Sequence, residues 1–171
     1  MQNYFELFSL TPNFNIDLKT LESTYQQQIS EFHPDKFATH SDKEKSLALQ
    51  NTSLINTAYD TLKSPLLRAT YLLELDGIQA FDEKDTQMDM AFLLSQIELR
   101  EALELIESRQ DELELDEFIE QVSSKITLNI AQITQAFSES DTTQIIKNLV
   151  RELKFYEQLN LQAKQLMDEW I

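Results

Sequence analysis

Glycine is almost absent from this chain, which has one glycine and three prolines in 171 residues. Average proteins contain about 7% glycine and about 5% proline, because tight turns, sheet hairpins and phosphate-binding loops need backbone angles that glycine adopts most easily. Long helices joined by short polar connections need few such residues. The sequence therefore predicts an all-α fold.

The composition also excludes several functional classes. Without cysteine the chain has no disulfide, no thiolate nucleophile and no cysteine metal site. No run approaches the ~20 apolar residues of a membrane span, and the first residues lack the plan of a signal peptide, so the cytoplasm is the expected compartment. The 14 basic and 30 acidic side chains argue against nucleic acid and anionic membranes, which bind clustered cations.

Charge divides the chain into two parts. Residues 1–76 have a net charge of −4 and residues 77–171 a net charge of −12. The change falls in L-D-G-I-Q-A-F-D-E-K-D-T-Q, which contains the only glycine and interrupts the helical pattern on both sides. We therefore expect an N-terminal domain at 1–76, a linker at 77–87 and a helical domain at 88–171, with different partners for the two domains.

The N-terminal domain is predicted to contain two antiparallel amphipathic helices. Asp17 caps the first helix, which must end at Phe32 or His33 because a proline follows. Ser41 starts the second, with Glu44 three residues later to complete a capping box. The predicted core stripes are Leu18, Leu21, Tyr25, Ile29 and Phe32 on the first helix, and Leu47, Asn51, Leu54, Ala58 and Leu62 on the second. The short segment Y-F-E-L-F ahead of them is expected to pack across the pair.

The loop between these helices carries the tripeptide His33, Pro34 and Asp35. A histidine base needs a nucleophile and an orienting acid, and a metal site needs three or more ligands; His40 is the only other histidine, so neither cluster is visible. A surface histidine or a helix cap is the ordinary interpretation of an isolated histidine. Recognition by another protein also fits, because a rigid loop loses little entropy on binding.

H-P-D-K-F between two amphipathic helices, followed by I-N-T-A-Y-D-T-L-K-S-P-L-L-R-A at 55–69, resembles a J-domain. J-domains are the modules by which co-chaperones engage seventy-kilodalton heat-shock chaperones. The resemblance implies that His33, Pro34 and Asp35, with Lys36 beside them, bind the chaperone and stimulate its ATPase. J-domains usually carry basic residues on the helix before H-P-D, whereas T-Y-Q-Q-Q-I-S-E-F has none. Weak electrostatic steering and a specialised partner chaperone are therefore expected.

The C-terminal domain is predicted to be an antiparallel three-helix bundle. Its helical stretches are 88–108, 112–137 and 142–170, joined by the short polar connections S-R-Q-D and S-E-S-D. The two longer stretches have one core stripe each: Leu115, Phe118, Ile119, Val122, Ile126, Ile133 and Phe137, and then Ile145, Leu149, Leu153, Tyr156, Ala163, Met167 and Trp170. A bundle that acts only as a spacer or as a dimerisation domain would explain these two stripes fully.

The first helix of the bundle is apolar on two sides. At roughly 100° per residue, one side holds Phe92, Leu99, Ala102, Leu103 and Ile106, and the other holds Leu93, Leu94, Ile97 and Leu105 among Glu98, Glu101 and Glu104. A bundle can bury only one of these sides. The other is then a protein-binding patch rimmed by carboxylates, unless the linker or the N-terminal domain covers it. Phe155 lies about a third of a turn from the centre of its own core stripe and is expected to behave similarly.

The order of a J-domain and an acidic three-helix bundle, with F-L-L-S-Q-I-E-L-R-E at their junction, resembles the HscB family of co-chaperones over essentially the whole chain. In that family the bundle binds the iron–sulfur cluster scaffold IscU, and the J-domain recruits the dedicated chaperone HscA. The resemblance implies a protein that is not an enzyme and needs no cofactor. It assigns scaffold binding to Leu93, Leu94, Ile97, Glu98, Glu101, Glu104 and Phe155.

Two alternatives remain open at this point. A J-domain protein with another client would keep the H-P-D activity but would not bind the scaffold. A bundle enzyme with carboxylate metal ligands would need inward glutamates and E-x-x-H pairs. No E-x-x-H occurs, and both histidines lie in H-P-D-K-F-A-T-H, so a metal site is not expected.

Overall fold

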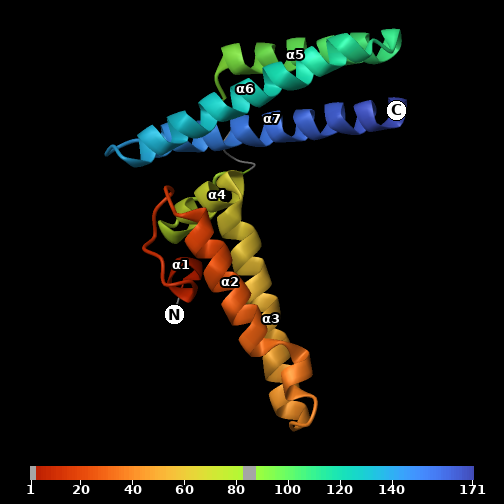
Figure 1. Ribbon diagram of the computed structural model, residues 1–171. Helices are drawn as coiled ribbons and strands as arrows, with labels where there is room; N and C mark the ends of the chain where they lie inside the picture. The colour runs from red at the N-terminus through yellow and green to blue at the C-terminus, as the bar shows by residue number, and fades with distance from the viewer. Residues whose placement is uncertain (1–2, 83–87) are drawn as a thin grey trace. The chain divides into compact units, whose positions relative to one another are not determined.

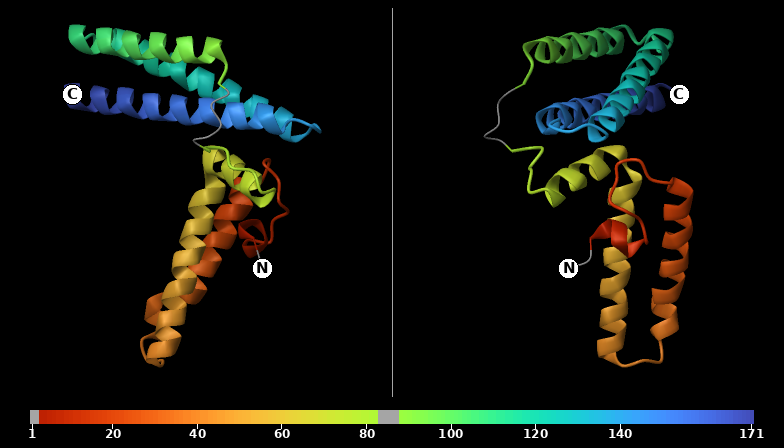
Figure 2. Two further views of the ribbon diagram at one scale, coloured as in Figure 1. Left: turned by 180° about the vertical axis from the view of Figure 1, so that it is seen from behind. Right: turned by 90° about the vertical axis from the view of Figure 1, so that its left-hand side faces the viewer.

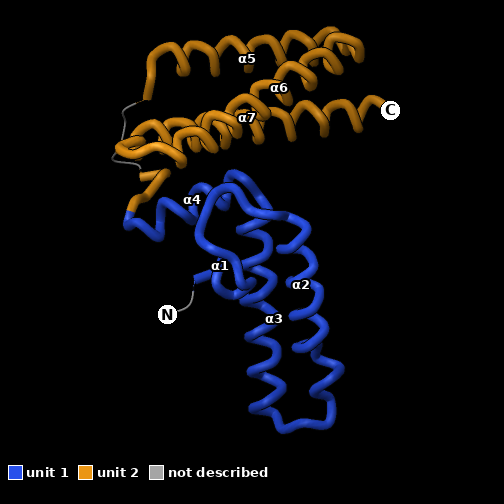
Figure 3. Tube along the Cα trace, turned by 60° about the vertical axis from the view of Figure 1, so that its left-hand side comes forward, with its two compact units in different colours: residues 1–77 blue, residues 78–171 orange. Residues whose placement is uncertain are grey.

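The computed structural model describes residues 3–82 and 88–171, and every regular element in these ranges is helical (Figure 1). The chain divides into two compact units, residues 1–77 and residues 78–171 (Figure 3). None of the helices in the described ranges has the length and apolar character that crossing a membrane requires. The predicted all-α fold is confirmed.

The first unit is built on a helical hairpin. Its elements are α1 (Tyr4–Leu7), α2 (Leu18–Phe32), the 3-10 turn η1 (Pro34–Phe37), α3 (Asp42–Lys63) and α4 (Pro65–Leu75). Helices α2 and α3 run antiparallel, with η1 in the connection between them (Figure 2). The side chain of Asp17 accepts the Lys19 N–H at the start of α2, and Ser41 Oγ accepts the Glu44 N–H at the start of α3. Both predicted N-caps are therefore confirmed, but the Glu44 side chain makes no bond to the Ser41 N–H, so the predicted capping box is incomplete.

The core of the first unit lies where α1 crosses the hairpin. Phe5 and Phe8 are fully buried against the fully buried Leu21 and Leu62. The expectation that Y-F-E-L-F packs across the helix pair is thus confirmed. Helical periodicity did not predict α4. A serine before a proline, as at Ser64, is nevertheless a strong signal for the start of a helix. In the structure Ser64 Oγ accepts the Leu67 N–H.

The predicted core stripe of α3 was partly wrong. Ala58 and Leu62 are buried as expected, but Leu47 and Leu54 are 56% and 47% exposed. The residues that follow them take their places: these are Ala48 and Ile55, which are 3% and 2% exposed. One residue turns the side chain by about 100° around a helix, so the phase of the stripe depends on which of two neighbouring apolar residues meets α2.

Arg68 joins several parts of the first unit. Its side chain is only 7% exposed, and Nη1 donates to the Leu62 carbonyl at 2.7 Å. The guanidinium carbon lies 4.7 Å from the centre of the Phe14 ring. Burial lowers the pKa of Arg68 from its usual range, while the carbonyl and the ring face favour the cation. Arg68 thereby satisfies a carbonyl in the last turn of α3 and fixes the loop that precedes α2.

The second unit contains three long helices whose ends match the predicted stretches to within two residues. They are α5 (Met90–Arg109), α6 (Glu112–Phe137) and α7 (Thr143–Trp170). Their shared core comprises Phe92, Leu99, Leu103 and Ile106 of α5, Leu115, Phe118 and Val122 of α6, and Phe155, Leu159 and Ala163 of α7. Along the rest of their length α6 and α7 pack on each other, and Asn129 Nδ2 donates to the Leu149 carbonyl at 3.0 Å. Ile145, predicted in the core, is 54% exposed and Ile146 is buried instead.

The turns of the bundle use left-handed residues other than glycine. Gln110 has φ 53° at the end of α5, and Asp141 has φ 59° before α7. An L-residue in this region costs about 1–2 kcal/mol, although aspartate tolerates it better than most. Neither connection of the bundle contains glycine, so Gln110 and Asp141 adopt the left-handed conformation in its place.

The predicted linker at 77–87 begins on the bundle itself. Residues 78–82 belong to the second unit, and Ala80 is only 2% exposed. Arg151 Nε donates to the Ala80 carbonyl at 2.8 Å, and Lys154 Nζ lies 4.5 Å from the centre of the Phe81 ring. The remainder of the predicted linker, 83–87, lies outside the described residues. A sequence pattern without helical periodicity did not show that 78–82 packs on α7.

Two neighbouring substitutions test the phase of α3. Ile55→Ala should lower the free energy of unfolding of the first unit by about 2–4 kcal/mol, because it leaves a cavity in the core. Leu54→Ala removes an exposed side chain and should cost less than about 1 kcal/mol. Urea unfolding followed by circular dichroism measures both. Equal losses, or a larger loss for Leu54→Ala, would contradict this packing.

Candidate functional site

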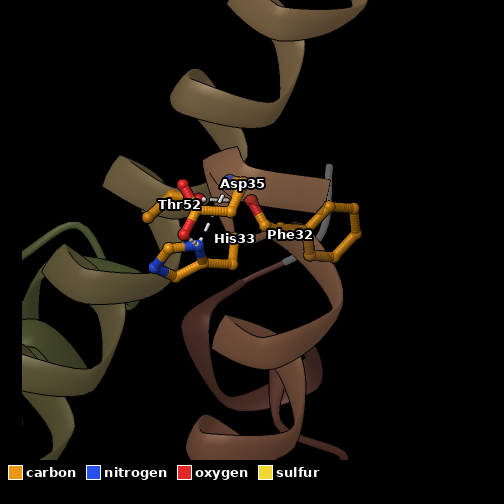
Figure 4. Close-up of polar contacts among 4 residues, drawn as sticks. All are labelled: Phe32, His33, Asp35 and Thr52. Carbon is orange, nitrogen blue, oxygen red and sulfur yellow. Dashed lines mark hydrogen bonds and ion pairs between the residues drawn. The ribbon is translucent and has the colours of Figure 1, made fainter. Parts of the chain in front are cut away.

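The H-P-D tripeptide forms a compact, exposed element at the end of α2. His33 ends α2 and caps η1, and its Nδ1 accepts the Asp35 N–H at 3.2 Å (Figure 4). Asp35 Oδ2 also lies 3.6 Å from Nδ1. An ion pair there would need a proton on Nδ1, whereas the hydrogen bond needs its lone pair. The directional bond to the backbone fits a neutral ring with its proton on Nε2.

The tripeptide is exposed, whereas Phe32 and Thr52, which hold it in place, are half-buried. The side chains of His33 and Asp35 are 52% and 92% exposed. Behind them, Thr52 Oγ1 of α3 lies 3.1 Å from the Phe32 carbonyl (Figure 4). The same oxygen lies 2.9 Å from the Ala48 carbonyl. The Phe32 ring packs against the core of the first unit. This arrangement holds the end of α2 against α3, so H-P-D projects from a rigid base. Sequence reasoning missed Thr52, because no local pattern marks it.

The helix before the tripeptide offers amides rather than cations. Gln28 Nε2 donates to the Leu7 carbonyl at 2.6 Å, so this side chain fastens α1 to α2. Gln26 and Gln27 are exposed and available to a partner. The nearest cation after the tripeptide is Lys36, which is exposed in η1. The surface that surrounds H-P-D is therefore polar with little net positive charge.

In the second unit, α5 buries one of its two apolar sides. Phe92 and Leu99 are each 7% exposed, whereas Leu94 and Ile97 are 55% and 53% exposed. Leu93 is half-buried, and exposed carboxylates surround the outer leucines and isoleucine: Glu98, Glu101 and Glu104. The expectation that only one side is buried in the bundle is confirmed. Neither α6, α7 nor residues 78–82 covers the outer side, which we call the α5 outer face.

Phe155 does not lie on an exposed surface, which corrects the expectation from its helical phase. It is 6% exposed, and its ring meets Phe92 edge-on with the ring centres 5.8 Å apart. The guanidinium carbon of Arg100 lies 5.2 Å from the centre of the same ring. Because α5 lies over this part of α7, a position off the centre of the α7 stripe is still covered.

Phe155 nevertheless borders an open hollow of about 330 Å³ that lies between α5, α7, residues 81–82 and Met88. Its walls include Phe81, Met88, Gln96, Arg100, Lys154 and Phe155. Phe155 is therefore reachable from outside the bundle through this hollow. We call it the Phe155 hollow.

A half-buried carboxylate lies near the start of α5. Burial raises the pKa of Glu152, and the negative charge of Asp89 raises it further. Asp89 is held in place as the N-cap of α5, where its carboxylate accepts the Ala91 N–H at 3.1 Å. The bundle therefore carries an unfavourable negative charge at neutral pH where α7 meets the start of α5.

The described residues do not form a metal-binding cluster. No group of three or more His, Cys, Asp or Glu side chains within 3–82 and 88–171 is placed to hold an ion. His33 and His40 lie in one connection of the first unit, and the carboxylates of α5 point outward. The candidate residues lie in two places instead, the H-P-D element of the first unit and the α5 outer face of the second.

Comparison with known proteins shows the family to which the chain belongs. A model described as the HSCB C-terminal oligomerisation domain matches residues 88–164. The Co-chaperone protein HscB homolog of Shewanella loihica is 40% identical over 169 residues, which cover 97% of this chain and 98% of that protein. The homolog of Pseudoalteromonas atlantica is also 40% identical, over 90% of this chain and 89% of that protein. The chain belongs to the HscB co-chaperone family.

Solved HscB structures agree over both units. Chaperone HscB from Vibrio cholerae is 36% identical with a TM-score of 0.87, over 99% of this chain and 100% of that one. Human co-chaperone protein HscB is 29% identical with a TM-score of 0.89, over 96% of this chain and 82% of that one. The resemblance to HscB inferred from sequence is thus confirmed, and the chain is a co-chaperone of iron–sulfur cluster assembly rather than an enzyme.

The raised pKa of Glu152 predicts that substitution of this residue stabilises the second unit in a pH-dependent way. An acid whose pKa is higher in the folded state destabilises the fold above that pKa, and this cost disappears as the pH falls through it. Glu152→Gln should therefore raise the free energy of unfolding of the second unit near pH 7, and the gain over wild type should shrink toward about pH 4. Urea titrations at several pH values measure this difference.

Glu117→Gln, at an exposed position of α6, is the matched control and should leave the free energy of unfolding nearly unchanged at each pH. If the increase in the free energy of unfolding caused by Glu152→Gln is constant with pH, or grows as the pH falls, the buried-charge explanation is contradicted.

Proposed function

We propose that this HscB-family protein is a two-site adaptor between an HscA-like heat-shock chaperone and an IscU-like scaffold protein. The observation that carries the proposal is the division of labour between the units. The first unit presents H-P-D from a rigid base, and the second leaves the α5 outer face uncovered. Each surface suits one partner, and neither has catalytic chemistry of its own.

The H-P-D element is the proposed chaperone-binding site. The Asp35 N–H fixes the imidazole of His33, and Pro34 fixes the backbone between them. Nε2–H, the proline ring and the Asp35 carboxylate are then preorganised, so docking costs little conformational entropy. In this proposal the docked element, with Lys36 beside it, accelerates ATP hydrolysis by the chaperone, which then closes on the scaffold.

The α5 outer face is the proposed scaffold-binding site. Leu93, Leu94 and Ile97 are apolar anchors, and a few such residues usually carry most of the affinity of an interface. The carboxylates around them favour a scaffold with a basic surface, namely Glu98, Glu101 and Glu104. Because these charges are exposed, binding should weaken at higher salt. Phe155 contributes from the floor of its hollow.

Carrying both sites on one chain raises the concentration of the scaffold at the chaperone. Tethering through a short connection gives effective concentrations up to about the millimolar range where both sites can engage. A weak contact at each site is therefore sufficient for delivery. The cytoplasm is the compartment in which we place this activity, as the sequence predicts.

A second use of the α5 outer face is favoured by one observation. The matching family model is described as an oligomerisation domain, so the same face could join two copies of this chain. Sedimentation of the free protein separates the two uses, because scaffold binding by a monomer needs no self-association.

Variants on the two units should separate the two activities. His33→Gln should abolish stimulation of the chaperone ATPase and leave the scaffold dissociation constant unchanged. Leu94→Ala combined with Ile97→Ala should weaken scaffold binding by about 10-fold or more and retain ATPase stimulation without scaffold. Calorimetry and steady-state ATPase assays measure the two effects.

Leu128→Ala, which removes an exposed leucine of α6, is the control and should change neither activity. Loss of both activities in either test variant would contradict the division between units. Intact ATPase stimulation without any scaffold binding by the wild type would indicate a J-domain protein with another client.

A further inference from the structure

Phe81, Asp82 and Met88 form one wall of the Phe155 hollow. The Ala80 carbonyl accepts the Arg151 Nε–H at 2.8 Å, which fastens this segment to α7. The next residue, Phe81, is 40% exposed and lines the hollow opposite α5. Lys154 lies over the Phe81 ring at 4.5 Å. Phe81 is therefore an accessible aromatic side chain in a fixed place rather than part of a free linker.

The hollow is continuous with the α5 outer face. Leu93, Ile97 and Arg100 follow one another on α5 at steps of four and three, so they lie in one row along the helix. Arg100 lines the hollow, while Ile97 is exposed beside it. A partner seated on Leu93 and Ile97 thus reaches the hollow without leaving the surface.

The hollow also differs in charge from the rest of the unit. Residues 77–171 carry a net charge of −12, yet this hollow is lined by a single carboxylate, Asp82, and by the half-buried cation Arg151. Two exposed cations, Arg100 and Lys154, also stand at it. Each lies over an aromatic ring of its wall, Arg100 over Phe155 and Lys154 over Phe81. The ring faces favour an apolar side chain, and the cations favour a carboxylate next to it.

We propose that Phe81 is a further scaffold-binding residue and that the Phe155 hollow receives an apolar side chain of the scaffold with an acidic residue beside it. Arg151 is the positioning residue, because it holds the segment that carries Phe81. The inference rests on the proposed function, since the scaffold is its ligand. In this arrangement the interface has carboxylates along α5 and cations at the hollow. This charge pattern fixes the direction in which the scaffold docks.

The test is calorimetric titration of the purified scaffold into full-length variants. Phe81→Ala should raise the dissociation constant about 10-fold, as loss of an aromatic contact typically does. Lys154→Glu should raise it about 5-fold or more at low salt and less at high salt. Leu128→Ala and Lys164→Glu are matched controls at exposed positions that do not line the hollow, and each should stay within about twofold of wild type.

The outcomes separate this inference from the proposed function. Wild-type binding that the Leu94, Ile97 double variant loses but Phe81→Ala retains in full would overturn the inference alone. Equal effects of Lys154→Glu and Lys164→Glu would overturn the acidic contact. Absence of wild-type binding would overturn the proposed function and the inference with it. Circular dichroism of each variant confirms that the bundle remains folded.

Discussion

A helix that packs on one or two neighbours can bury only one side of its surface, and both units of this chain depend on which side that is. In α5 the buried side holds Phe92 and Leu99, so Leu94 and Ile97 face solvent although they are equally apolar. Exposed apolar residues in a patch lower solubility unless something binds them, which is why such patches usually mark interfaces. The side of α5 that packs in the bundle therefore determines both the core of the bundle and its candidate binding surface.

The core and the surface also meet physically at Phe155. Its ring completes the bundle core through an edge-on contact with Phe92, and it still forms part of the floor of a hollow that opens beside the α5 outer face. Substitution of Phe155 would therefore disturb the fold as well as the proposed scaffold contact. Phe81 offers a cleaner probe, because it lies in the wall of the same hollow and is not part of the bundle core.

The first unit instead presents a small polar element, H-P-D, in a fixed shape. Pro34 ends α2, the Asp35 N–H orients His33, and Thr52 holds the last carbonyl of α2 against α3. All of these contacts lie within the first unit, so the element keeps its shape without contributions from the bundle. A rigid H-P-D element on one unit and an uncovered apolar face on the other are consistent with the proposed two-site adaptor.

The sequence by itself determined the features that depend on neighbouring residues: the all-α class, the end of α2 before Pro34, the caps at Asp17 and Ser41, and the two apolar sides of α5. It did not determine the phase of α3 at Leu54 and Ile55, the burial of Phe155, or the packing of Ala80 on Arg151. Those depend on side chains from other helices, 71 residues away in the case of Ala80 and Arg151. Helical periodicity shows which residues share a side, but only tertiary packing decides which side another helix covers.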